Sequence, residues 1–320
     1  MSVPIAGRAS LRAALQAHFT PYLALAVGML AVSCSAILIS FARREGVPAI
    51  AIAALRMAFS AAGLAPLVLT RGRAELFRLP LGDLALAAGS GALLALHFAF
   101  WISSLDYTSV MSSVVLVSTN PLFVALATVL VLREPLGRWT GLGIAVAIAG
   151  GALVGLSDLG QAGGSSLKGD LLALLGAAAA SGYLLIGRYL RRRMSLLPYV
   201  GVAYSTAAVV LVAIAVVSGT PLLGYSLAGY ALVGLIAAGP QLIGHTSYNW
   251  ALKHVSAVFV TVTLLAEPVG ATLLAIPLLA EVPSPVRLLG GAVILAGIWF
   301  AARGERRKEN SRNGSRRNSR

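Results

Sequence analysis

The chain has few charged residues and almost no cysteine, and both shortages restrict what it can be. Charged residues occupy 11% of its 320 positions, whereas a soluble domain carries about 25%. The lone cysteine, Cys34, cannot form an internal disulfide. Because 58% of the residues are hydrophobic and the mean hydropathy is +0.85, we expect an integral membrane protein.

Residue types that common enzymes and metal sites need are also scarce. None of the three lysines follows a glycine, so no Gly-Lys-Ser/Thr phosphate loop can form. The four histidines form no His-Glu-x-x-His pair, and one cysteine cannot complete a zinc site. We therefore expect no enzyme activity, no cofactor and no metal. The alternative of a membrane enzyme or a receptor would depend on Cys34 and His97 as a loose nucleophile and base.

Ten stretches of the chain are apolar over about 20 residues, the length that crosses the hydrocarbon core of a bilayer. Each run is continuous rather than alternating, which favours transmembrane helices over a barrel built of strands. We expect spans at 21–41, 47–69, 83–104, 108–132, 137–157, 170–190, 196–218, 228–252, 255–280 and 284–302.

One set of residues occurs twice within these spans. Pro121, Glu134, Gly143 and Gly150 recur at identical spacing as Pro268, Glu281, Gly290 and Gly297. That offset is 147 residues, and an offset of 148 relates Gly28, Ser33, Arg43 and Arg44 to Gly176, Ser181, Arg191 and Arg192. Internal duplication is typical of secondary transporters. Because each copy has an odd number of spans, we expect the second copy to cross the membrane upside down.

The predicted fold is an all-α integral membrane protein with ten transmembrane helices in two inverted five-helix repeats. Its parts are a cytoplasmic N-terminal segment (1–20), a first five-helix repeat (21–157), a loop (158–169), a second five-helix repeat (170–302) and a disordered basic cytoplasmic tail (303–320). Disorder is predicted for the tail because it is highly charged and lacks aromatic residues.

The positive charges indicate how the chain is oriented. If the N-terminus is cytoplasmic, twenty of the 25 Lys and Arg residues lie in inner segments and only four in outer ones. The positive-inside rule then places both termini in the cytoplasm, and we expect a bacterial inner membrane. Much of the net charge of +14 lies in the tail, which has no aromatic residue to stack on bases. We therefore expect contact with anionic membrane lipid and none with nucleic acid.

The repeated Pro-x12-Glu-x8-Gly-x6-Gly pattern, in a duplicated ten-span chain, resembles the EamA family of the drug/metabolite transporter superfamily over roughly residues 21 to 302. The resemblance implies a central cavity lined by helices 1, 3, 4, 6, 8 and 9, with alternating access between the two halves. It also implies a small-molecule substrate and the export of metabolites such as amino acids, with a drug or cationic-compound exporter as the alternative. Many relatives carry tryptophan in helices 1 and 6, where this chain has Ser33 and Ser181, so we expect a wider or more polar cavity there.

Glu267 is the strongest candidate for a functional residue within the spans. An ionisable side chain at mid-membrane costs about 2.5–3.5 kcal/mol, so it needs a partner, water or a function. Its repeat mate is Asn120, and each of the two precedes a proline that removes one backbone hydrogen bond. Inverted-repeat transporters bind their substrates at this depth. A carboxyl group there would carry a proton or recognise a positive group, unless it only donates a hydrogen bond between packed helices.

Other polar residues of the spans are candidates because of their helical spacing. His97 and Trp101 share one face of the third helix, and Gln241, His245 and Tyr248 share a face of the eighth. Arg56 could bind a substrate carboxylate, pair with Glu267, or bond to carbonyls at a helix end. The full candidate set is Glu267, Asn120, His97, Trp101, Gln241, His245, Tyr248, Ser33, Cys34, Ser181, Tyr183 and Arg56, with helix breaks at Pro121, Pro240 and Pro268. The alternatives are a satisfied core histidine and small residues that only allow close packing.

Two features of the fifth and tenth helices are predicted to be structural. Gly143, Ala147, Gly151 and Gly155 recur every four residues and predict a smooth ridge for close helix contact or for a dimer. The protein is accordingly expected to be a monomer or a homodimer. Glu134 and Glu281 are predicted to stabilise the positive ends of these helices.

Overall fold

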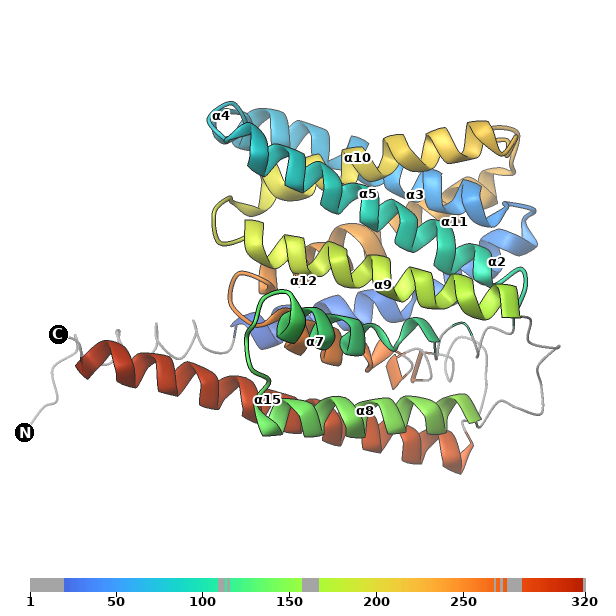
Figure 1. Ribbon diagram of the computed structural model, residues 1–320. Coiled ribbons are helices and arrows are strands. Elements are labelled where there is room, and N and C mark those ends of the chain that lie inside the picture. The colour runs from blue at the N-terminus through green and yellow to red at the C-terminus, as the bar shows by residue number, and fades with distance from the viewer. Residues whose placement is uncertain are drawn as a thin grey trace, which may run out of the picture.

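The computed structural model describes residues 20–108, 113, 116–156, 167–267, 269–270, 273–274 and 284–318. Pro268, Glu281 and most of the predicted loop at 158–169 lie outside the described residues. Within the described ranges every regular element is a helix (Figure 1). The elements are a helix at 20–33, α2 (Ser35–Arg44), α3 (Ala49–Leu67), the π-helix η1 (Val68–Gly72), α4 (Arg73–Leu76), α5 (Leu81–Ser104), α7 (Asn120–Leu130), α8 (Arg138–Leu156), α9 (Leu167–Leu190), α10 (Leu196–Val217), α11 (Leu227–Ile236), the π-helix η2 (Ala237–His245), α12 (Thr246–Ala251), α13 (Ala257–Leu264) and α15 (Pro285–Asn318).

Seven described helical segments are long and apolar enough to cross a membrane. They are Thr20–Arg44, Ala49–Leu76, Leu81–Ser104, Leu167–Leu190, Leu196–Val217, Leu227–Ala251 and Leu288–Arg307. Two shorter apolar helices, Asn120–Leu130 and Arg138–Leu153, fall within the fourth and fifth predicted spans. The predicted all-α membrane class is confirmed, while the count of ten spans stays a prediction.

The contact between α8 and α15 has the symmetry that inverted copies require. A Cβ atom added at Gly143 would lie 2.7 Å from the carbonyl oxygen of Gly297, and one added at Gly150 would lie 2.8 Å from that of Gly290. Gly143 is the repeat mate of Gly290, and Gly150 is the mate of Gly297. Replacing each glycine by its repeat mate therefore turns one close approach into the other, as a two-fold axis between the copies requires. The two helices lie side by side in Figure 1.

The glycine ridge of α8 differs in register from the prediction. Gly151 has no neighbour within 4 Å of an added Cβ, whereas a Cβ on Gly297 would lie 2.5 Å from the backbone nitrogen of Ala147. The contact therefore follows residues 143, 147 and 150, because a helix turns once every 3.6 residues rather than every four. The ridge packs within the chain, against α15.

A second pair of contacts that the duplication relates lies near the centre of the bundle. The hydroxyl of Ser33 donates to the backbone carbonyl of Glu267 (3.3 Å), and the hydroxyl of Ser181 donates to that of Asn120 (3.1 Å). Ser33 and Ser181 are repeat mates, as are Glu267 and Asn120. The first helix thus holds the segment at Glu267 in the way that α9 holds the start of α7.

Helix breaks occur at the two positions that the duplication relates. Residues 118–119 form a turn before α7, and residues 265–266 form a turn after α13. Pro121 lies in the first turn of α7, where its missing N–H would have had no helical partner. It therefore begins a new helix instead of kinking a continuous one. Pro240, the other described proline predicted to break a helix, lies inside the π-helix η2.

The prediction that Glu134 lies at the start of the fifth helix is wrong. Helix α8 begins at Arg138 and has no acidic residue in its first turn. The backbone at Arg133 is left-handed, with a φ of 52°, a conformation that ends helices. Pro135 and Gly137 then delay the next helix, so Glu134 stays in the connecting segment.

Helix α15 continues through Asn318, where the sequence predicts a disordered tail from residue 303. The carboxylate of Glu305 accepts hydrogen bonds from the backbone N–H and the hydroxyl of Ser256, both at 2.6 Å. These bonds hold α15 to the start of α13 beyond the predicted end of the span. The helix then projects from the end of the bundle (Figure 1).

Candidate functional site

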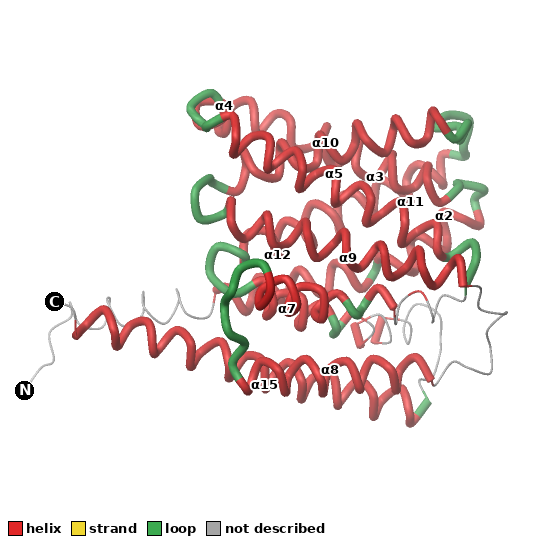
Figure 2. The backbone as a smooth tube through the Cα atoms, in the orientation of Figure 1, coloured by secondary structure: helices red, strands yellow, loops and turns green. Residues whose placement is uncertain are grey.

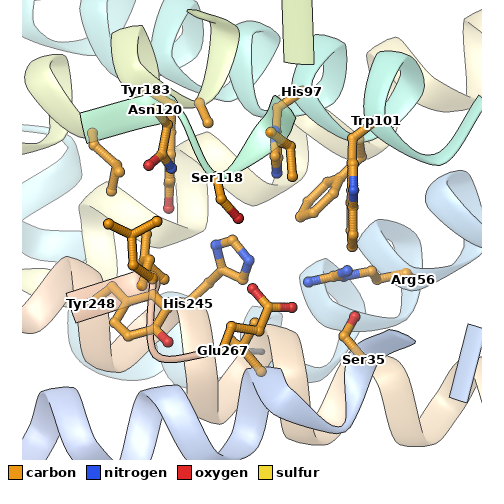
Figure 3. A pocket seen from close by; sticks show the side chains of 17 residues that line it. Ser35, Arg56, His97, Trp101, Ser118, Asn120, Tyr183, His245, Tyr248 and Glu267 are labelled. Atoms are coloured by element: carbon orange, nitrogen blue, oxygen red, sulfur yellow. The ribbon is translucent and has the colours of Figure 1, made fainter. Parts of the chain in front are cut away.

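The two helix breaks border a central cavity of about 70 Å³ to which both halves of the chain contribute (Figure 3). Its walls come from the helices that the family resemblance implies, and α3 is added through Arg56. The lining residues are Val32, Ser35, Arg56, His97, Phe98, Trp101, Val117, Ser118, Asn120, Ala180, Tyr183, Leu184, His245, Tyr248, Leu264, Leu265 and Glu267.

Most of the candidates chosen from the sequence border this one cavity. The eight that do so are Glu267, Asn120, His97, Trp101, His245, Tyr248, Tyr183 and Arg56. Ser33 and Ser181 instead donate hydrogen bonds to the backbone at the two helix breaks. Gln241 accepts a hydrogen bond from Arg56 and does not line the cavity itself.

Cys34 lies in the turn before α2, and its thiol approaches the carbonyl of Leu30 at 3.8 Å. His97 makes its own hydrogen bond to the carbonyl of Gly176. Among the described residues, no hydrogen bond joins Cys34 to His97 as a nucleophile and base would require.

Nine lining residues were not among the candidates, and three of them carry a polar group or contact Arg56. Ser35 lines the cavity in place of Ser33 and Cys34 because the turn at Cys34 interrupts the helical spacing. Ser118 lies in the turn that precedes Asn120, and the proline at 121 was the signal that could have revealed it. Phe98 packs its ring against Arg56, and an apolar residue of this kind gives no signal in sequence.

Aromatic side chains on α5, η2 and α12 surround the cavity. The rings of His97 and Trp101 are nearly parallel, with centroids 5.9 Å apart. His97 Nδ1 lies 2.9 Å from the carbonyl oxygen of Gly176, and because a carbonyl can only accept, this nitrogen carries the proton. One ring nitrogen of His97 is thus used to hold α9, and only the other is available to a substrate. His245 makes edge contacts with Phe98 and Tyr248.

Arg56 and Glu267 bring opposite charges to the same cavity. Arg56 is only 1% exposed, its Nε donates to Gln241 Oε1 at 3.0 Å, and its guanidinium lies 4.0 Å from the centroid of Phe98. Figure 3 shows the guanidinium and the Glu267 carboxylate pointing toward each other. They attract electrostatically, yet the ion pairs found in the described part of the chain do not include this one.

Several polar atoms around the cavity have no hydrogen-bond partner among the described residues. They are Arg56 Nη1 and Nη2, Trp101 Nε1, Asn120 Oδ1, Tyr248 OH and Ser35 Oγ. Leaving one buried polar group unpaired costs about 1–3 kcal/mol. Such groups are uncommon in proteins, so their concentration around one cavity is typical of a site that water or a ligand completes.

A second cavity of about 370 Å³ lies between the segment that joins α7 to α8 and residues 304–307 of α15. Charged residues line it, among them Glu134, Arg138, Arg188 and Glu305. Arg188 also donates to the carbonyl of Val255. This cavity is away from both helix breaks, so it is the weaker candidate for a substrate site.

Comparison with known proteins places both halves of the chain in one family. The EamA-like transporter family matches residues 20–156 and 167–303, once in each half. A solved structure described only as the crystal structure of a protein has a TM-score of 0.73 and 23% identity, covering 90% of this chain and 98% of that chain. At that identity it supports the fold alone. No curated protein matches the chain.

Proposed function

Since this chain belongs to the EamA-like transporter family and is a multi-pass membrane transporter, we propose that it is a secondary transporter that exports small metabolites such as amino acids. The observation that carries the proposal is the central cavity, where Arg56 and Glu267 lie beside two symmetry-related helix breaks. Discontinuous helices near the bilayer midplane form the substrate sites of many inverted-repeat transporters.

The charges and walls of the cavity favour a zwitterion with an apolar side chain. A guanidinium and a carboxylate that are not joined to each other can bind a carboxylate and an ammonium group, respectively. Leu184, Leu264 and Leu265 provide apolar wall, which suits the side chain of a hydrophobic amino acid. A fully apolar ligand would leave both charges unpaired in a dry cavity, at considerable cost.

The symmetry of the fold supports alternating access as the mechanism. Arg56 belongs to the first half of the chain and Glu267 to the second, so a substrate held between them bridges both halves. The hydrogen bonds of Ser33 and Ser181 hold the two helix breaks in equivalent ways. Inverted repeats allow each half to take the conformation of the other. Movement of the halves around the substrate would then open the cavity to one side at a time.

A drug or cationic-compound exporter is the second candidate. Glu267 together with the aromatic rings of Trp101, Phe98 and Tyr248 would suit an amphipathic cation. Arg56 opposes this alternative, because a cation in the cavity would meet an unpaired positive charge.

Transport by the purified protein in liposomes tests the proposal. Loaded proteoliposomes would be offered labelled amino acids in one series and lipophilic cations in another, with protein-free liposomes as the control. We expect saturable counterflow of hydrophobic amino acids. Transport of cations alone would support the alternative, and transport of neither class would overturn the proposed substrates.

A further inference from the structure

We propose that Gln241 is a positioning residue that holds Arg56 as a fork for the carboxylate of a zwitterionic amino acid. The inference rests on the proposed function and adds how the substrate is oriented. Gln241 is fully buried and does not line the cavity. Its effect on the substrate would therefore pass through Arg56.

Two contacts fix the plane of the Arg56 guanidinium. Nε donates to Gln241 Oε1 at 3.0 Å, and one face of the group lies 4.0 Å from the ring centroid of Phe98. A guanidinium is a planar fork of five N–H donors. Once its Nε and one face are occupied, the donors on Nη1 and Nη2 remain, and neither atom has a partner in the described part of the chain.

The two free nitrogens match the chemistry of a carboxylate. Parallel N–H bonds to two carboxylate oxygens are stronger than neutral hydrogen bonds and fix the orientation of the bound group. A buried cation without a partner is costly, so a ligand that neutralises it is favoured. With its carboxylate on Arg56, an amino acid would turn its ammonium group toward Glu267, which faces Arg56 across the cavity (Figure 3).

The backbone around Gln241 explains how its side chain reaches Arg56. Gln241 follows Pro240 inside the π-helix η2, and a π-helix rotates side chains away from the faces that normal helical spacing gives. The hydroxyl of Ser60 contacts the carbonyls of both Arg56 (2.8 Å) and Ala237 (3.4 Å). It joins the same two elements without touching the guanidinium, which makes it a matched control.

The experiment measures transport of L-leucine by the full-length protein in proteoliposomes, and its competition by unlabelled leucine and by isopentylamine, which lacks the carboxylate. For Gln241→Ala we expect the KM for leucine to rise about tenfold with little change in kcat, because a bond made equally in the ground and transition states is lost. Inhibition by isopentylamine should stay within about twofold of wild type, since the amine makes no bond that depends on the fork.

Gln241→Glu separates positioning from packing. It keeps the size and the acceptor of Gln241, but its charge pairs with the guanidinium and competes with the substrate carboxylate, so the leucine KM should again rise. A purely structural role would be rescued by this nearly isosteric change. Ser60→Ala should leave the ratio of leucine to isopentylamine affinity unchanged.

The outcomes distinguish this inference from the proposed function. If the wild type transports leucine but both Gln241 variants keep its KM, or weaken leucine and isopentylamine equally, the fork is overturned and the proposed function stands. If Gln241→Ala does not fold, the leucine KM of Gln241→Glu decides whether the fork stands. If the wild type does not transport leucine at all, the proposed substrate class fails and the fork fails with it.

Discussion

At the scale of single residues, the centre of the protein is defined by unequal repeat mates. Glu267 and Asn120 follow equivalent helix breaks and both border the cavity, but only one of them is ionisable. Each carbonyl is held by an equivalent serine, so the backbone is symmetric where the side-chain charge is not. The duplication therefore supplies the scaffold, and the difference between the mates supplies the chemistry.

Replacing Glu267 tests whether that charge is used. Glu267→Gln keeps the shape and hydrogen bonding of the side chain while removing its charge and its proton. We expect transport to fall at least about tenfold, the cost of losing a charge-assisted bond, with an undiminished amount of folded protein. Asn120→Ala should have a milder effect. If protons are coupled to transport, the wild-type rate should vary with pH and the Gln rate should not. Normal transport by Glu267→Gln at every pH, with unchanged substrate preference, would make the residue structural.

How far the candidate site could be predicted depended on the regularity of each helix. His97 and Trp101 lie on the regular helix α5, and their predicted shared face agrees with the structure. Gln241 lies in a π-helix, where helical spacing no longer tells which way a side chain points. The turn at Cys34 has the same effect on the first helix and brings Ser35 to the cavity instead. Local departures from the α-helix are set by packing between segments and leave little trace in a single sequence.

At the scale of elements, the glycines of α8 act by allowing backbones to approach. A Cβ on Gly150 would lie 2.6 Å from the backbone nitrogen of Ile294, whereas one on Gly151 would meet nothing within 4 Å. Adjacent positions on one helix therefore differ completely in their tolerance of a side chain. The four-residue spacing assigned Gly151 to the contact, which the structure gives to Gly150 instead.

Alanine at these two positions gives a matched comparison. Gly150→Ala should destabilise the protein by about 1–3 kcal/mol, because the clash is with backbone atoms that cannot rotate away. Gly151→Ala should be neutral or stabilising by up to about 1 kcal/mol, since alanine favours a helix over glycine. The midpoint of thermal unfolding in detergent checks both. Equal midpoints for the two variants would mean that α8 and α15 are not packed as described.

The junction between α13 and α15 predicts where the chain can be shortened. Stopping after Arg307 keeps Glu305 and its two bonds to Ser256, so transport should be unchanged. Stopping after Ala302 removes those bonds and should lower both thermal stability and the transport rate, because Ser256 caps the N-terminus of α13. Transport rates per inserted molecule in proteoliposomes distinguish the two lengths. Loss of transport in a correctly inserted Arg307 truncation would instead give the rest of the tail a role in the cycle.

At the scale of the whole molecule, the class of fold could be predicted because the repeated residues include glycines that a close contact between two helix backbones requires. The glycines that recur at the 147-residue offset are those that meet across α8 and α15. The ends of helices were harder to predict. The start of α8 follows the left-handed residue Arg133. Beyond the predicted end of its span, α15 is held by a hydrogen bond between Glu305 and Ser256, which are 49 positions apart in the sequence.

The ends of the bundle differ in charge. Figure 2 shows the loops that follow α4, α7, α9 and α12 gathered at the end from which α15 projects. These loops contain Arg78, Arg133, Arg191 to Arg193 and Lys253, whereas the loops at 45–48, 105–108 and 218–226 contain no Lys or Arg. Arg43, an exception at the opposite end, is neutralised by Asp106 at 2.5 Å. The distribution supports an orientation with the projecting end in the cytoplasm.

Labelling of single cysteines tests that orientation. In a Cys34→Ala background, Leu223→Cys and Phe77→Cys place one thiol at each end of the bundle, on side chains that are 80% and 79% exposed. A membrane-impermeant maleimide added to intact cells should label position 223 and leave position 77 unlabelled until the membrane is opened. A reporter fused after Arg320 should read as cytoplasmic, because α15 ends on the same side as residue 77. If position 77 were labelled from outside while position 223 was protected, the basic end would face outward, and the positive-inside argument and the cytoplasmic placement of the termini would both be wrong.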